Sequence, residues 1–414
     1  MNTEAKIRVL MAQALPDQEG HGSLRDLADG HRPRQALDPI NIRRLADRGF
    51  GKSSLFRILL TNACAFDCSY CPMRASRELP RHALEPAALA GIFMTAYRRG
   101  WVTGLFVTSG IPKSPRWAMD RLLELVEIVR FRHRYTGYLH AKAVAGAEPA
   151  QVERLALLCD RVSYNLESAC QATLDRVAPE KRLEDGLGLL RAVRETARAA
   201  GRRRLPRDPR PPGPAVRAGS TSQFVVGLGT ETDRDLLSTT HTLWRDQTIH
   251  HPHFAAFRPI EDTPLENDPE TPVLREHRLY QADYLLRQYG FSPAELVYAG
   301  SGNLPLARDP KLTWALAHPE RFPVEIATAD RETLLRVPGL GPKTVERMLS
   351  LRRTLARIEL PDLSKLGGYA RRAAGFLAHR GRRLGNPAFQ NELFSQEEFP
   401  APSRRYSFSP GTFR

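Results

Sequence analysis

Three of the chain's five cysteines stand within eight residues, at Cys64, Cys68 and Cys71, directly after the apolar run 56–60. Thiolates are soft ligands that suit zinc or iron–sulfur clusters. A structural zinc site normally takes a fourth Cys or His from nearby, yet the nearest histidine is His82 and the other two cysteines are far along the chain. Three thiolates on a four-iron cluster leave one iron open to a small molecule. A zinc knuckle and three unrelated core cysteines are the alternatives.

The spacing Cys-x3-Cys-x2-Cys, with the aromatic Tyr70 just before the last cysteine, resembles the signature of radical S-adenosylmethionine (SAM) enzymes. The resemblance implies that the three cysteines hold a 4Fe–4S cluster, that SAM chelates the open iron, and that Tyr70 lies at the cofactor. It also implies cleavage of SAM to a 5′-deoxyadenosyl radical, and an electron donor such as flavodoxin or ferredoxin. A cofactor that carries the hard chemistry explains why no acid–base or nucleophile constellation is needed.

The composition is that of a protein without membrane spans, and we expect it in the cytoplasm. Its 414 residues allow two or three domains, and 42% apolar residues suffice for a core. No apolar run approaches the length of a membrane helix, and the first residues lack the layout of a signal peptide. Clustered cysteines also agree with a reducing compartment. The net charge of +15 favours a polyanionic partner.

Strand and helix patterns alternate through the first two thirds of the chain. Helices are predicted at 85–99 and 117–131, and strands at 56–60, 104–107, 138–144, 161–166, 223–228 and 254–260. Such alternation implies a parallel sheet. Six units resemble the partial (β/α)6 barrel of radical SAM enzymes, so the predicted fold class is α/β, with ligands at the carboxyl ends of the strands.

The residues at three of these strand ends are candidates to contact SAM. They are Thr108, Ser109 and Gly110 after the second strand, Asn165 and Glu167 at the fourth, and Gly227 at the fifth. The superfamily commonly has Gly-Gly-Glu after the second strand, where the acid helps to hold the methionine amino group, and this chain lacks that acid. The resemblance places the polar pair near the ribose and carboxylate of SAM, and Gly227 along the adenine. The alternative for the polar pair is an ordinary turn after a strand.

Several segments beyond the strands carry weaker signals. Residues 198–217 are too rich in Arg and Pro to bury a core, so we expect a mobile loop, either simply solvated or touching a phosphate backbone. The acidic stretch 262–272 indicates the exit from the barrel, and a helix is predicted at 273–289. Loop 300–305 is expected near the barrel mouth. Lys311, on the next helix, faces either the substrate or the surface.

Residues 334–348 resemble a helix-hairpin-helix, a DNA-binding element that does not read sequence. A Pro-Gly-x-Gly turn joins two helices whose apolar residues are expected to face inward, namely Leu334, Val337, Val345 and Met348. Gly339 and Gly341 allow backbone amides to approach a phosphate, and Lys343 adds charge. Such contacts position a protein on DNA without specifying sequence. Residues 363–372 look like a degenerate second copy, and the alternative is a helical hairpin that only packs on the barrel.

A radical SAM barrel followed by this hairpin resembles a family of radical SAM proteins assigned to DNA modification or repair, as do the phrases at 105–111 and 309–312. The resemblance implies a substrate class, DNA, and no product. Two other functions stay open: an RNA-modifying radical SAM enzyme, and a DNA-binding protein whose iron–sulfur cluster is structural.

The predicted domain plan is an N-terminal extension at 1–50, the barrel at 51–268, a helical connector at 269–320, an all-α helix-hairpin-helix module at 321–380, and a disordered tail at 381–414. Within the tail, Gln390, Leu393 and Phe394 match the pentapeptide with which many bacterial DNA-processing proteins dock on the sliding clamp. The clamp is therefore a predicted partner. The alternative is a tail that folds back on the barrel through Phe389, Leu393 and Phe394.

Overall fold

The computed structural model describes residues 3–14, 55–202, 215–352 and 370–385. These residues divide between two compact units. The first runs to Glu231 and includes Thr242–Thr271, and the second contains Thr232–His241 and the chain from Pro272 onward. Among the described helices none is long and apolar enough to cross a membrane.

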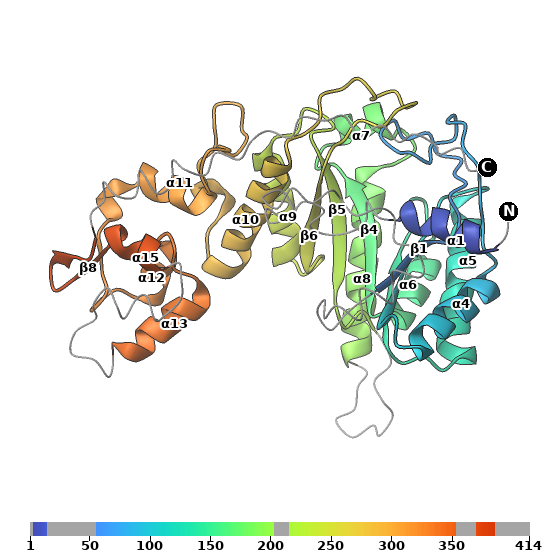
Figure 1. The fold of residues 1–414 in the computed structure, drawn as a ribbon, viewed down its shortest axis with the longest axis horizontal. Helices are drawn as coiled ribbons and strands as arrows, with labels where there is room; N and C mark the ends of the chain where they lie inside the picture. The colour runs from blue at the N-terminus through green and yellow to red at the C-terminus, as the bar shows by residue number, and fades with distance from the viewer. Residues whose placement is uncertain (1–2, 15–54, 203–214, 353–369, 386–414) are drawn as a thin grey trace. The chain divides into compact units, whose positions relative to one another are not determined.

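The first unit is built on one parallel sheet of six strands in sequential order. The strands are β1 (Leu55–Leu59), β2 (Gly104–Thr108), β3 (Tyr138–Lys142), β4 (Arg161–Glu167), β5 (Ser220–Val226) and β6 (His251–Ala256). Helices α4 (Pro86–Arg98), α5 (Pro115–Glu127), α6 (Pro149–Leu158) and α8 (Leu183–Arg202) lie along one face of the sheet (Figure 1). The predicted α/β class, with six parallel strands, is confirmed.

Local signals in the sequence explain where these helices begin. Ser114 accepts a hydrogen bond from the amide of Trp117 and caps α5, which has proline in its first turn. A reciprocal pair between Glu148 and Gln151 forms a capping box at α6. The predicted helix at 117–131 corresponds to α5 followed by one π-helical turn, Ile128–Arg132.

The last two strands of the sheet begin three residues before their predicted starts, at Ser220 and His251. The prediction followed the apolar runs, whereas the strands open with polar residues that are buried in pairs. The hydroxyl of Thr221, for example, donates to the carbonyl oxygen of His251 at 2.7 Å. Hydrogen bonds to a neighbouring strand leave no periodic pattern in the sequence of either strand.

The described part of the second unit is mainly helical. Its longest helix, α10 (Val273–Tyr289), coincides with its predicted range. The shorter helices are α11 (Pro310–Ala317), α12 (Arg331–Arg336), α13 (Pro342–Leu351) and α15 (Ala370–Ala373). Helix α9 (Asp233–Arg245) begins in this unit. Loop 300–305 also belongs here, where Asn303 accepts hydrogen bonds from the amide of Asp233 and from Arg275. The expectation that this loop lies near the barrel mouth is therefore not tested.

The C-terminal module is predicted to be all-α, but the structure shows strands in it as well. A three-stranded sheet joins β7 (Val324–Glu325), β8 (Leu377–His379) and β9 (Arg382–Arg383). The predicted start of a disordered tail, at 381, falls inside the β8–β9 hairpin. Strands of two or three residues show no periodicity, and they exist here because backbone pairing supplies partners from distant sequence.

Several predictions fall outside the described residues. They concern most of the N-terminal extension, the core of the Arg/Pro-rich insertion at 203–214, the second hairpin copy at 363–368, and the tail from 386, which includes the clamp pentapeptide.

Arg130 is a buried cation of the first unit that makes several hydrogen bonds. Its guanidinium donates to the carbonyl oxygens of Leu158, Tyr135 and Gly137 at 2.8–2.9 Å. It also donates to Asp160 at 2.8 Å, and the second oxygen of Asp160 accepts from Arg217. Because a buried charge is tolerated only when it is paired and hydrogen-bonded, this network fixes the connections that lead into β3 and β4.

Replacing Arg130 with Ala should lower the free energy of unfolding by about 3–5 kcal/mol, because it removes one of the two arginines that pair with the buried Asp160. Chemical denaturation followed by circular dichroism measures the change. Arg132→Ala is the matched control, since Arg132 lies two residues away and is exposed. Equal stability of the two variants would contradict a structural role for the network.

Candidate functional site

The loop that follows β1 carries the three clustered cysteines. Cys68 is buried, whereas Cys64 and Cys71 are half-buried, and all three are free of disulfide bonds. Burial raises the pKa of the Cys68 thiol to about 11, and burial together with the nearby Cys68 raises that of Cys71 to about 12. Ligand binding at these sulfurs must therefore displace protons, as metal binding to thiols does.

Arg81 shapes this loop from within, and sequence reasoning missed it. Its guanidinium donates to the carbonyl oxygens of Asn62 at 2.9 Å, Met73 at 2.7 Å and Arg74 at 2.6 Å. The fully buried Asn62 side chain accepts from the amide of His82 at 2.6 Å. One cation that collects several backbone carbonyls holds a loop closed where no regular ladder could. No motif marks Arg81, because its partners come from loop geometry.

Asp67 and Arg74 form a clip across the same loop. The Nε of Arg74 donates to Asp67 at 2.8 Å, and the amide of Ser76 donates to the same carboxylate at 3.0 Å. The hydrogen bond from Arg74 holds the pKa of Asp67 well below its ordinary value. The clip spans the segment that contains Cys68 and Cys71, so it helps to set their separation.

Backbone pairing continues past the ends of β1 and β2 and fixes the first cysteine. The amide of Gly110 donates to Thr61 at 2.8 Å, and that of Ala65 donates to Ile111 at 2.6 Å. A Cβ at Gly110 would lie 2.2 Å from the carbonyl oxygen of Ala63. Gly110 is therefore required by the approach of the cysteine loop itself.

The neighbours of Gly110 have local roles in the structure. Thr108 is buried at the end of β2, and its carbonyl accepts from the amide of Leu60 at 2.8 Å. The Ser109 hydroxyl donates to the carbonyl of Gly110 at 2.7 Å. Contact of Thr108, Ser109 and Gly110 with SAM stays a prediction.

Tyr70 and Glu167, both predicted at the cofactor, are joined by a lysine that the sequence analysis did not identify. The ammonium of Lys181 donates to Glu167 at 2.7 Å and to the Tyr70 hydroxyl at 3.3 Å. Burial opposes ionisation of Glu167, but the charge of Lys181 outweighs it and holds the pKa of Glu167 below its ordinary value. Lys181 lies between α7 (Gln171–Val177) and α8, so only tertiary folding brings it here.

Two buried acceptors at the end of β4 have no hydrogen-bond partner among the described residues. They are Oδ1 of Asn165 and Oε2 of Glu167. The ladder shifts register between these two residues, and Glu167 has a positive φ of 65°. A buried acceptor without a donor costs about 1–3 kcal/mol. The amino and hydroxyl groups of SAM would supply such donors, so the residues present fit this cofactor.

Gly227, at the end of β5, has a positive φ of 91°. A Cβ there would lie 2.0 Å from the hydroxyl of Thr271, which donates to the carbonyl of Val226 at 2.9 Å. Packing of the chain therefore already requires glycine at this position. Its predicted place along the adenine is not tested.

The donor set of the cysteine loop suits a cluster better than a single ion. No three Cys, His, Asp or Glu side chains within the described ranges are grouped closely enough to hold one metal ion. A four-iron cluster differs, because each cysteine binds a different iron and the three sulfurs stand apart. Three free cysteines on one tethered loop match that requirement.

A family model decides between these possibilities. The model of the Radical SAM superfamily matches residues 58–243, which include the cysteine loop and strands β2 to β5. The chain therefore contains a radical SAM domain. The superfamily uses a 4Fe–4S cluster and SAM, so the predicted cofactors and the prediction of an enzyme are confirmed at the level of this domain.

Several solved structures are similar to the chain at low sequence identity. HydG, a maturase of the FeFe-hydrogenase, gives a TM-score of 0.42 at 14% identity, over 55% of this chain and 48% of that one. Methylornithine synthase (PylB) gives a TM-score of 0.43 at 16% identity, over 67% of this chain and 76% of that one. HydG from Carboxydothermus hydrogenoformans gives a TM-score of 0.42 at 17% identity, over 64% of this chain and 62% of that one. The chain thus spans about half of the first protein, and no protein with a curated description matches the sequence.

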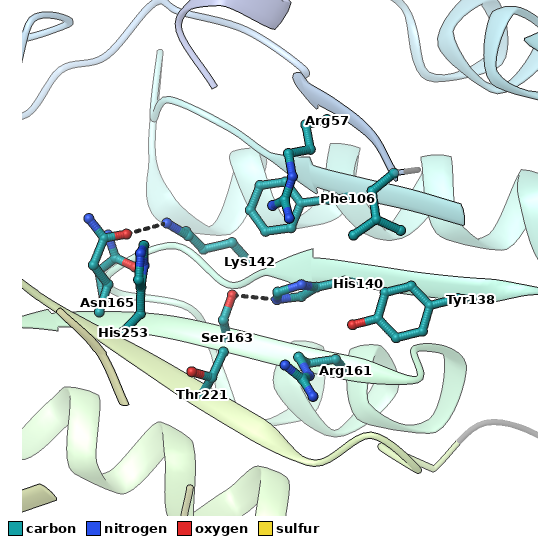
Figure 2. Close-up of a pocket in the computed structure, with 12 residues that line it drawn as sticks. Arg57, Phe106, Tyr138, His140, Lys142, Arg161, Ser163, Asn165, Thr221 and His253 are labelled. Carbon is teal, nitrogen blue, oxygen red and sulfur yellow. Dashed lines mark hydrogen bonds between the residues drawn. The ribbon is translucent and has the colours of Figure 1, made fainter. Parts of the chain in front are cut away.

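The interior face of the radical SAM domain holds a cavity of about 200 Å³. Figure 2 shows that side chains of β1 to β6 converge on it. Asn165 is the one predicted site residue that lines it, and the described lining is Leu55, Arg57, Phe106, Tyr138, His140, Lys142, Arg161, Ser163, Asn165, Thr221, Gln223 and His253. Sequence reasoning missed the other eleven, because their shared face appears only when the strands are paired.

In the second unit, the structure places helices α12 and α13 on either side of the Pro-Gly turn. The four apolar residues predicted to face inward are all buried. Gly339 has a positive φ of 83°, Gly341 precedes the first turn of α13, and Lys343 is exposed. Lys311, expected to face either the substrate or the surface, is instead buried and donates to the carbonyl of Leu340 in this turn at 2.6 Å. DNA binding by this helix pair stays a prediction.

Replacing Gly110 with Ala should weaken assembly of the cluster, because the added Cβ pushes against the backbone beside Cys64. We expect a stability loss of about 1–3 kcal/mol and a clear drop in iron bound after anaerobic reconstitution. Gly91→Ala in α4 is the matched control, since nothing lies within 4 Å of a Cβ at that position. Wild-type iron content in the Gly110 variant would show that the close approach does not matter.

Proposed function

We propose that this chain is a radical SAM enzyme that acts on DNA in modification or repair. The observation that carries the proposal is the presence, on one chain, of a radical SAM domain and of a helix pair with an exposed lysine beside a glycine turn. The net charge of +15 supports a polyanionic partner. The substrates that the names of the similar solved structures imply are those proteins' own.

The cysteine loop positions the groups that would start the reaction. Cys64, Cys68 and Cys71 would hold the 4Fe–4S cluster, which with SAM supplies a radical able to abstract hydrogen. Arg81 and the Asp67–Arg74 clip keep the three sulfurs at fixed separations. Asn165 and Glu167 offer buried acceptors to the amino and hydroxyl groups of SAM. A reactive radical must be kept away from water, and that task falls to the protein around the cofactor.

The helix pair supports DNA as the substrate class. Within α13 the first amide hydrogen bond runs from Val345 to Gly341 at 2.9 Å. Pro342 has no N–H, so the amides of Lys343 and Thr344 come before that bond, at the positive end of the helix dipole. A phosphate would meet these two amides and the Lys343 ammonium. A target nucleotide would have to leave the stack to reach the barrel.

The two alternatives make different demands. An RNA-modifying enzyme would use the same helix pair, and competition between matched DNA and RNA duplexes separates the two substrates. A structural cluster would leave SAM intact, and loss of one cysteine would then unfold the protein.

Replacing Cys68 with Ser should abolish reductive cleavage of SAM and lower bound iron, while the fold remains. Anaerobic reconstitution of the wild type should give about four irons per chain and deoxyadenosine with dithionite. The control is Cys170→Ser, which lies outside the loop at the start of α7. An iron-free wild type, or one inert toward SAM, would end the enzymatic proposal. Unfolding of the Cys68 variant would favour a structural cluster.

Replacing Lys343 with Glu should weaken DNA binding at all sequences and lower the slope of log affinity against log salt by roughly one. The reason is the loss of one phosphate contact. Lys113→Glu makes the same charge change at an exposed position of the first unit and serves as the control. Titration of fluorescent duplexes at several salt concentrations gives both quantities. Unchanged affinity in the Lys343 variant would reject the helix pair as a phosphate site.

A further inference from the structure

Two arginines face the interior of the sheet in one row. Arg57 on β1 pairs in register with Phe106 on β2, Phe106 with His140 on β3, and His140 with Arg161 on β4. All four side chains line the interior cavity (Figure 2). Because side chains alternate between the two faces of a strand, residues paired in this way share one face and one height.

Contacts within the row hold the cations in place. The guanidinium of Arg57 lies 5.1 Å from the centre of the Phe106 ring, and that ring meets His140 edge-on at 4.6 Å. The ammonium of Lys142, two residues after His140 on β3, lies 6.0 Å from the centre of the Phe106 ring. Arg161 donates to the carbonyl oxygen of Ala218 at 2.8 Å. Three positive charges therefore stand around one aromatic pair.

None of the lining residues that the structure describes is Asp or Glu. Burial, followed by the charges of Arg161, Lys142 and Arg57, lowers the pKa of His140 well below its ordinary value. His140 is thus an uncharged ring that bonds to the hydroxyl of Ser163 at 2.8 Å. Thr221 and Gln223 add a hydroxyl and an amide to the wall.

We propose that this row, Arg57 and Arg161 with Lys142 above it, binds a phosphomonoester group of the substrate. That this phosphate belongs to a nucleotide rests on the proposed function; the anion site itself does not. The planar guanidinium of arginine matches the oxygens of a phosphate. A phosphomonoester near neutral pH carries almost two negative charges, so it balances three cations better than a carboxylate with one negative charge would.

The size of the cavity selects a terminal phosphate. Pockets that enclose drug-sized ligands measure about 300–1,000 Å³, and this one measures about 200 Å³. It takes one end of a molecule, but not a nucleic-acid strand that enters and leaves. The substrate therefore presents the 5′ or 3′ end of a strand, or is a free phosphorylated nucleotide.

The row lies further from the carboxyl ends of the strands than the cysteine loop and Glu167 do. Arg57 and His140 lie two residues before the ends of β1 and β3, a step of about 7 Å along a strand. The cysteine loop and Glu167 lie at or beyond the carboxyl ends, whereas Asn165 lies two residues before the end of β4 and lines the same cavity. A phosphate in the row would thus sit beneath the cofactor and hold the remainder of the substrate toward it.

Calorimetric titration of the full-length chain tests this site, with thymidine 5′-monophosphate and thymidine as probes, first alone and then with saturating SAM. We expect the monophosphate to bind at least about tenfold more tightly than the nucleoside, with or without SAM. Arg57→Gln and Lys142→Gln should each weaken monophosphate binding by about tenfold or more, the loss of one charge-assisted hydrogen bond. Arg116→Gln is the control, because its side chain is 71% exposed on α5.

Equal binding of thymidine and its monophosphate, or unchanged binding in a folded Lys142→Gln or Arg57→Gln variant, would overturn the proposal. Abolition of monophosphate binding by SAM would also overturn it, because the cations would then serve the carboxylate of SAM. Circular dichroism checks the fold of each variant, and two independent variants keep the test decisive if one misfolds.

Oligonucleotides separate the two sources of the phosphate. A single strand with a 5′-phosphate or a 3′-phosphate that binds more tightly than the same strand with hydroxyl ends, and more tightly than the mononucleotide, assigns the site to strand ends. Tighter binding of the mononucleotide assigns it to a free nucleotide. The mononucleotide titrations, and the comparison of phosphate with hydroxyl ends on one strand, report on the barrel site, whereas the Lys343→Glu titration reports on the proposed action on DNA, so the two proposals fail separately.

Discussion

The contact on which the site depends is the continued pairing of backbone beyond the ends of β1 and β2. Strand pairing normally stops where strands diverge, but here Thr61 and Ile111 keep accepting amide hydrogen bonds from the opposite segment. This extension holds the first cysteine against the sheet, and it leaves no space for a side chain at Gly110. The cysteine loop inherits the rigidity of the sheet, which a free loop of the same sequence would lack.

Hydrogen-bonded cations then hold the segments that strand pairing does not reach. Arg81 gathers carbonyls inside the cysteine loop, Lys181 joins Glu167 to Tyr70, and Arg130 ties the entry of β4 to the preceding turns. Removing one partner of such a network leaves a charge or a carbonyl unpaired, which costs more than the intact contact contributes. The domain thus uses the polar backbone of its irregular segments as a second scaffold beside its apolar core.

The two faces of the sheet have opposite chemistry. The outer face packs apolar helices, whereas the inner face carries arginine, lysine, histidine and hydroxyl side chains around a cavity. Polar groups on a buried face are costly unless they are paired or serve a ligand. The described lining brings together three cations and no Asp or Glu, which is why we propose that it binds an anion.

The sequence by itself determined the cysteine loop, the α/β class and the approximate positions of the six parallel strands and of helices α4, α5 and α10. Those features depend on short-range order: ligand spacing, hydrophobic period and helix caps, as at Ser114 and Glu148. Helix α10 matches its predicted range because Pro272 precedes it and Gly290, with a φ of 72°, ends it.

Tertiary structure alone decided which distant residues meet. The Lys181–Glu167–Tyr70 group, the row from Arg57 to Arg161 and the sheet β7–β8–β9 join residues that lie far apart in the chain. No local pattern records such meetings, because each residue alone resembles an ordinary polar or charged side chain. Their register is set by the pairing of whole strands, and a shift of one residue in any strand would turn its cations or hydroxyls to the other face.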